Sequence, residues 1–232
     1  MVARLGALAR NRSDRMIRSG IVPIDELCEG FRPRSTYLIT GGAGAGKTTY
    51  ALQFLDQGLR SGERVVMLTH TSRDALFAHA EQLGVQLRPA LRDGRAVVLR
   101  YRSDFALRMA RAGTAARVFE ELRQLVIEYR PARIVLDSFA PLLDDGSSSA
   151  IAATMLAELL ERSQATALLT YSDDLAARYD RRLEPLVQFA AGVFCLTRDG
   201  AGMRWVEVLT LRGQESGTAL GARQLAEPIE AR

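Results

Sequence analysis

The residues best suited to chemistry form a run of small side chains that ends in a lysine and two threonines. The run is made of Gly41, Gly42, Ala43, Gly44, Ala45, Gly46, Lys47, Thr48 and Thr49. It fits the phosphate-binding pattern of glycine, any four residues, glycine, lysine and threonine. Glycine adopts positive φ and allows close approach of the backbone, so the loop can turn its N–H groups toward phosphates. Lys47 would add charge on the β and γ phosphates, and the Thr48 hydroxyl would join a Mg²⁺ shell. The pattern predicts a P-loop that binds ATP with Mg²⁺.

A second candidate is Asp137, which ends the apolar run Ile134, Val135 and Leu136. By itself, an aspartate after an apolar strand is more often a turn or helix cap. A P-loop site, however, needs an acid at the end of another strand to hold the metal through water. We therefore interpret Asp137 as that acid, so that the predicted metal-binding residues are Thr48 and Asp137.

These residues need a scaffold, and short apolar runs alternate with helical patterns along the chain. This alternation predicts an α/β fold with a mostly parallel twisted sheet, helices on both faces and a C-terminal antiparallel hairpin. A stripe of apolar residues predicts a helix over 118–129 that Pro131 ends, and a second helix follows the serine-rich loop 144–149. The predicted strands are 37–40, 65–69, 96–100, 133–136 and 166–170, and the hairpin joins 192–196 to 204–211.

Length and composition agree with one domain. The 232 residues have 47% apolar and 25% charged side chains, and no apolar run approaches the length of a membrane helix. We expect a cytoplasmic protein with a basic N-terminal segment (1–19), an ATP-binding domain (20–213) and a C-terminal tail (214–232), either loose or a short helix. Five arginines lie in the first segment, which we interpret as a solvated arm, with binding to an anionic surface as the alternative.

Several motifs together resemble the KaiC branch of the RecA-like ATPases. The matching segments are 20–27 with Gly30, the P-loop with 51–55, the strand 133–138 and the late segment 208–213. This resemblance implies a RecA-like fold and assembly as a ring, commonly a hexamer, with ATP between subunits. It also places Thr170, at the end of another strand, where a polar group commonly senses the γ-phosphate.

The chain departs from this family at two places. Where the family has two glutamates that polarise the attacking water, this sequence has Thr71 and Ser72, preceded by His70. An alcohol is too weak a base for that role, and His70 is an alternative base. Thr210 replaces the family's lysine. Arg212 remains, either to act on the neighbour's nucleotide during hydrolysis or only to bind the neighbour's nucleotide or a carboxylate. His79 is interpreted as a helix-face residue.

These departures predict an ATP-binding regulatory or assembly protein with weak or absent hydrolysis. We expect self-association as a dimer or ring with nucleotide at the interface, a further protein partner and no membrane insertion. One alternative is an active ATPase or autokinase of KaiC type with Asp74 or Asp173 as base. Another is a recombinase-like DNA-binding ATPase, which the mild net charge of +4 does not favour.

Overall fold

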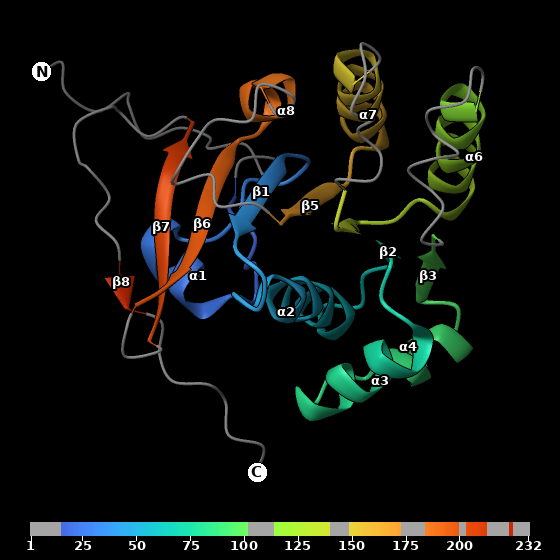
Figure 1. The fold of residues 1–232 in the computed structure, drawn as a ribbon. Helices are drawn as coiled ribbons and strands as arrows, with labels where there is room; N and C mark the ends of the chain where they lie inside the picture. Colours follow the sequence, from blue (N-terminus) through green and yellow to red (C-terminus); the bar gives the residue numbers. More distant parts are fainter. Residues whose placement is uncertain are drawn as a thin grey trace, which may run out of the picture.

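The computed structural model describes residues 15–101, 114–139, 149–172, 184–199, 203–212 and 223–224, and all statements below concern these residues. A central sheet lies between two layers of helices (Figure 1). Residues 144–148 of the serine-rich loop and the alternative base Asp173 lie outside the described residues.

The sheet has eight strands in the order β3-β2-β4-β5-β1-β6-β7-β8. The strands from β3 to β6 in this order are parallel, whereas β7 is antiparallel to β6. The predicted fold class is therefore confirmed. Three predicted strands have the observed bounds, and the other four are longer by one or two residues at their ends. The strands are β1 (Thr36–Gly41), β2 (Val65–Thr69), β3 (Ala96–Arg100), β4 (Arg133–Asp137), β5 (Thr166–Tyr171), β6 (Gly192–Arg198), β7 (Arg204–Leu211) and β8 (Arg223–Gln224).

Strand β8 corrects the prediction of a loose or helical tail. Its two residues pair with Trp205 and Val206 of β7, so this part of the tail extends the sheet. A strand of two residues is too short to give a periodic signal, and backbone pairing with the edge of β7 defines it instead.

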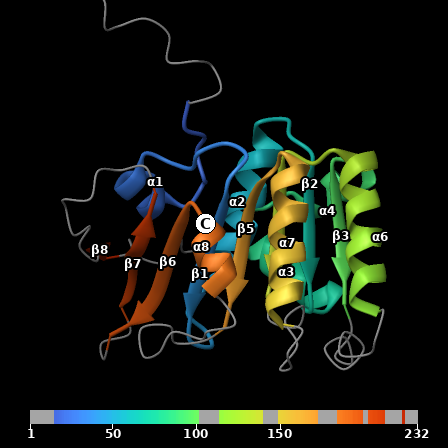
Figure 2. The ribbon, with the colours of Figure 1, turned by 90° about the horizontal axis from the view of Figure 1, so that it is seen from above.

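The helices divide between the two faces of the sheet (Figure 2). Helices α2, α3 and α4 lie on one face, and α6, α7 and α8 lie on the other. The two predicted helices are confirmed with earlier starts, at Thr114 and Ser149. The helices are α1 (Val22–Cys28), α2 (Lys47–Arg60), α3 (Arg73–Gln82), α4 (Leu87–Arg92), α6 (Thr114–Tyr129), α7 (Ser149–Ser163) and α8 (Glu184–Phe189). None of the helices in the described ranges is long and apolar enough to cross a bilayer.

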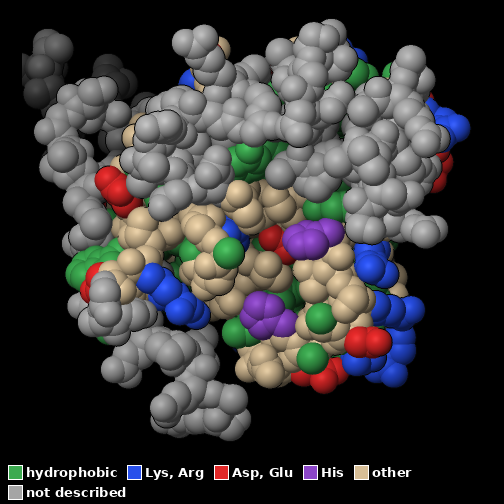
Figure 3. All heavy atoms as spheres, viewed as in Figure 1, with side chains coloured by type: hydrophobic (Ala, Val, Ile, Leu, Met, Phe, Trp, Pro, Cys, Tyr) green, Lys and Arg blue, Asp and Glu red, His purple; other side chains and the backbone are tan. Residues whose placement is uncertain are grey.

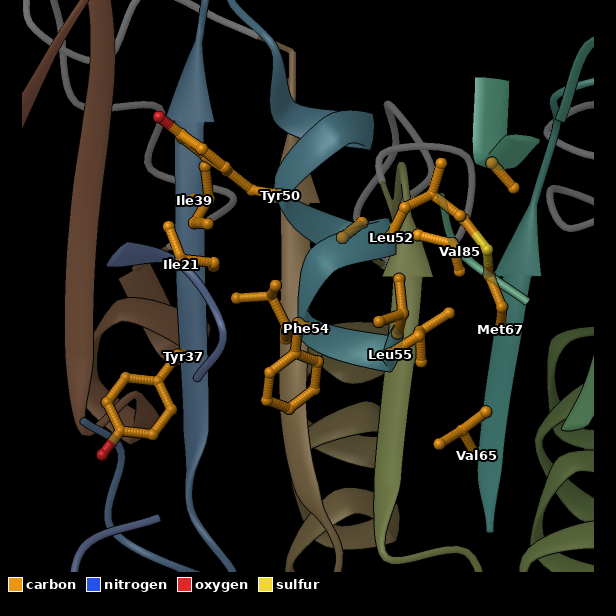
Figure 4. Packing of buried hydrophobic residues seen from close by; sticks show 14 of the residues in the cluster. Ile21, Tyr37, Ile39, Tyr50, Leu52, Phe54, Leu55, Val65, Met67 and Val85 are labelled. Atoms are coloured by element: carbon orange, nitrogen blue, oxygen red, sulfur yellow. The ribbon is translucent and has the colours of Figure 1, made fainter. Parts of the chain in front are cut away.

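The core has two parts, one on each side of the sheet, because successive side chains of a strand point to opposite faces. Ile39 of β1 belongs to the cluster under α2, whereas its neighbour Leu38 belongs to the cluster under α6 and α7. Leu52, Phe54 and Leu55 bring the apolar face of α2 into the first cluster (Figure 4). This packing fixes α2 against the sheet, and with it the loop that joins β1 to α2.

Candidate nucleotide-binding site

The predicted P-loop connects the carboxyl end of β1 to the start of α2. Gly46, the N-cap of α2, has a φ of 102° and no side chain that could accept from the first N–H groups of the helix. Those N–H groups have no partner within a helix, and the helix dipole favours negative charge beside them. Gly41 has a φ of 143°, and a Cβ there would lie 2.4 Å from the carbonyl oxygen of Leu196 in β6. The loop is thus built to receive an anion.

Lys47 lies folded against this loop. Its buried ammonium donates to the carbonyl oxygens of Gly41 and Gly42, each at 2.7 Å. Burial lowers the pKa of Lys47 from its usual value, and the negative charge of Asp137 acts in the opposite direction. The ammonium is therefore held at the phosphate-binding loop by groups of the loop itself.

Asp137 connects the P-loop helix to two strands of the sheet. The strand register places Asp137 beside Thr69 of β2 and Thr170 of β5. Its carboxylate accepts from the Thr170 hydroxyl at 2.6 Å and from the Thr48 hydroxyl at 3.0 Å. The side chains predicted to bind the metal and to sense the γ-phosphate are thus brought together at the carboxyl edge of the parallel strands, where open α/β sheets bind ligands.

The oxygen atoms of Thr48 and Asp137 fit magnesium, which prefers oxygen ligands and keeps several waters. Within the described ranges, no group of three or more His, Cys, Asp or Glu side chains is placed to hold a metal. A magnesium ion here would accordingly be held by Thr48, the nucleotide and water, with Asp137 beside it. The charge that magnesium supplies when bound neutralises the phosphate oxygens.

The segment after β2 holds Thr71 and Ser72, which the resemblance predicts to replace a glutamate pair. The Thr71 N–H donates to the Thr69 hydroxyl oxygen at 3.1 Å, and the Ser72 hydroxyl oxygen accepts from the Ala75 N–H at 3.3 Å as the N-cap of α3. His70 is exposed, and its Nδ1 lies 3.4 Å from the hydroxyl of Tyr101. Ser72 therefore has a structural role as the N-cap of α3, which was not among its predicted roles.

His79, interpreted as a helix-face residue, lies on α3 and also reaches this site. Its Nε2 is 3.1 Å from the Thr49 hydroxyl at the start of α2. Burial lowers the pKa of His79, with an opposing contribution from Asp137. The available signal was spacing: His79 follows Leu76 by three residues and precedes Leu83 by four, so it shares their inward face. Both histidines of the chain reach the surface on one face of the molecule (Figure 3).

Arg204 is a second residue that the sequence analysis missed. A Cβ placed on Gly46 would lie 3.6 Å from the Arg204 Nη1, so the guanidinium borders the P-loop. Because β7 is antiparallel to β6, Arg204 at its start pairs with Arg198 at the carboxyl end of β6. No spacing rule links residues 46 and 204, and only the hairpin brings them together.

Arg212 lies near the amino-terminal ends of β1 and β6, whereas the P-loop lies at their carboxyl ends. Leu211 pairs with Gly192 at the start of β6, and Gly192 pairs with Tyr37 near the start of β1. The exposed Arg212 follows Leu211, whereas the P-loop follows the end of β1. A strand advances about 3.3 Å per residue, so roughly 15–20 Å of sheet separates Arg212 from its own P-loop.

A parallel sheet with a P-loop, a strand-end aspartate and helices on both faces defines a RecA-type P-loop ATPase domain. The family described as "ATPase: KaiC" matches residues 17–219, and the chain belongs to this family. It is 32% identical over 142 residues to the circadian clock oscillator protein KaiC of Rippkaea orientalis, covering 60% of this chain and 26% of that protein. It is 30% identical over 138 residues to the circadian clock protein KaiC3 of Synechocystis sp., covering 58% and 26%. The matched region is thus about a quarter of the length of these relatives.

Proposed function

We propose that this chain binds Mg·ATP at residues 41–49 as a conformational or assembly ligand and hydrolyses it slowly or not at all. Membership of an ATPase family and the geometry of the P-loop support nucleotide binding. The Thr48 and Asp137 pair supports a role for magnesium. The names of the relatives refer to circadian clocks, but the proposal rests on the nucleotide site.

The observation that carries the proposal is the loop after β2, where Thr71 and Ser72 stand in place of two carboxylates. A hydroxyl group is too weakly basic near neutral pH to activate the attacking water. Ser72 is also engaged as the N-cap of α3. Asp74, the alternative base, is exposed in the first turn of α3. The site thus combines an intact binding loop with no carboxylate at the positions that polarise water.

A ligand of this kind acts through its different affinity for two states of the protein. A nucleotide that binds only the folded state stabilises it by about 2.7 kcal/mol at a concentration of one hundred times its Kd. Saturating Mg·ATP should therefore raise the melting temperature without being consumed.

The test is calorimetric titration with Mg·ATP together with a sensitive assay of phosphate release. We expect binding to the wild-type chain, loss of binding in Lys47→Ala, and turnover near the assay's limit. Multiple-turnover phosphate release that Lys47→Ala abolishes would instead establish an active ATPase and overturn the slow-hydrolysis proposal.

A gain-of-function variant sharpens this test. Thr71→Glu combined with Ser72→Asp restores two carboxylates, and aspartate keeps a side-chain acceptor at the N-cap of α3. We expect faster phosphate release from this variant than from the matched isosteric control, Thr71→Gln with Ser72→Asn. Equal rates in the two variants would count against the absent carboxylates as the cause of slow hydrolysis.

A further inference from the structure

We propose that His79 is a positioning residue of the nucleotide site, which holds the Thr49 hydroxyl and links the P-loop helix to α3. The proposal rests on the proposed binding of Mg·ATP and adds a residue and a coupled element to that site. Its central observation is the hydrogen bond of 3.1 Å between His79 Nε2 and the Thr49 hydroxyl.

The Thr49 hydroxyl has an alternative hydrogen-bond partner within its own helix. Thr49 lies in the first turn of α2, and a helical threonine commonly turns its hydroxyl toward the carbonyl group four residues earlier, which here belongs to Ala45. His79 offers the hydroxyl a partner on another helix. The rotamer of Thr49 is thereby set by contact with α3, beside the N–H groups that face an anion.

The environment of His79 suits this role. Burial lowers the pKa of the imidazole, and the neutral ring can either accept from or donate to a hydroxyl group. The negative charge of Asp137 acts on both His79 and Lys47, which places both side chains in the field of the same carboxylate. His79 is thus part of the electrostatic environment of the P-loop, although it comes from a different element.

Two adjacent threonines are consequently held from two directions. Thr48 donates to Asp137 of β4, and Thr49 bonds with His79 of α3. Helix α3 begins at Arg73, directly after the segment 70–72 that replaces the glutamate pair. A nucleotide that changes the position of Thr49 therefore acts directly on α3 and on the segment before it.

The first experiment is a double-mutant cycle on Mg·ATP affinity, measured by calorimetry. His79→Leu should weaken binding about fivefold, in line with one hydrogen bond, when Thr49 is present. In a Thr49→Val background the same substitution should have almost no effect, because the bond is already absent. An equal loss in both backgrounds would overturn the proposal, since His79 would then act independently of Thr49.

Substitution of His79 by glutamine or asparagine tests whether an amide at the position of Nε2 restores the affinity for Mg·ATP. The side-chain nitrogen of glutamine reaches the position of imidazole Nε2, whereas asparagine ends near Nδ1. His79→Gln should keep most of the wild-type affinity, and His79→Asn should bind as weakly as His79→Leu. Thermal unfolding without nucleotide checks that every variant is folded. Equal affinity in all the variants would overturn this inference alone, whereas failure of the wild-type chain to bind Mg·ATP would overturn the proposed function with it.

Amide hydrogen exchange tests the link to α3. Mg·ATP should slow exchange over residues 73–82 in the wild-type chain and in His79→Gln, and this protection should be lost in His79→Asn. Protection of α3 that persists unchanged in His79→Asn at saturating Mg·ATP would overturn the proposed coupling.

Discussion

Asp137 is the residue on which the polar network of the site converges. One carboxylate oxygen accepts from Thr170 and the other from Thr48, and the side chain is buried. Hydrogen bonds to a charged group contribute about 1.5–3 kcal/mol each, more than those between neutral groups. The same negative charge repels a nucleotide unless a cation lies between them, so Asp137 should make ATP binding depend on magnesium.

Asp137→Asn should therefore remove the magnesium dependence of ATP affinity. With magnesium present, affinity should fall about tenfold or more, which corresponds to about 1.4 kcal/mol. Without magnesium, affinity should stay equal or increase, because a repulsive charge is gone. Thr170→Val is the matched control, since it removes one hydrogen bond and leaves the carboxylate charge. Titrations with and without magnesium measure both effects, and an unchanged magnesium dependence in Asp137→Asn would refute the metal role.

A residue's role in the site can be predicted from sequence only when the residues it acts with are close to it in the chain or belong to a known motif. The P-loop was predictable because all its binding residues are consecutive in the sequence. Asp137 was predictable because it ends an apolar run in a chain that also contains a P-loop motif. His79 and Arg204 approach the loop only through tertiary packing, from α3 and from the start of β7. No local pattern links Arg204 to the loop, and the spacing of His79 from Leu76 and Leu83 indicates only an inward face, not a contact with Thr49.

At the scale of elements, helix α2 contains a glycine that its packing requires. Gly58 lies in the interior of α2, where glycine costs about 1 kcal/mol relative to alanine. A Cβ there would lie 2.7 Å from Cδ and 2.8 Å from Nε of Arg133. Arg133 is buried, forms an ion pair of 2.5 Å with Glu63 and donates to the carbonyl oxygen of Phe54 at 3.1 Å. Gly58 thus makes room for the arginine that ties β4 to α2.

Gly58→Ala should consequently destabilise the protein despite the higher helix propensity of alanine. Crowding a filled site commonly costs about 1–3 kcal/mol, which exceeds the gain in propensity. In an Arg133→Met background, Gly58→Ala should be neutral or stabilising, because the flexible methionine side chain can move away from the new Cβ. Urea unfolding of the wild type, the two single variants and the double variant gives the coupling free energy between positions 58 and 133. Equal destabilisation in both backgrounds would show that Arg133 is not the obstacle.

The elements also show what patterns can and cannot predict. Strands of five residues or more with apolar side chains on both faces were predicted well, because burial on both sides gives an unbroken apolar run. Short helices such as α4, with six residues, offer less than two full turns for a periodic pattern. Strand β8 is defined by pairing with β7 alone, so nothing in its two residues marks it beforehand.

At the scale of the whole molecule, the two ends of β7 lie at different distances from the chain's own P-loop. Arg204 borders the chain's own P-loop, whereas Arg212 lies roughly a strand length away at the other edge of the sheet. Arg212 is therefore too far from its own nucleotide to touch it. Any contact of Arg212 with a nucleotide must involve the P-loop of a second copy.

Because Arg204 and Arg212 lie at different distances from the chain's own P-loop, their alanine variants should change the mass of the protein in solution in different ways. Light scattering should show a larger mass with saturating Mg·ATP than without nucleotide. Arg204→Ala should shift this response to higher ATP concentration, because it removes a cation beside the P-loop of the same chain. Arg212→Ala should abolish the increase in mass while leaving the affinity of the isolated chain for Mg·ATP nearly unchanged. A mass that saturating Mg·ATP does not alter would refute nucleotide-dependent assembly and leave ATP acting within a single chain.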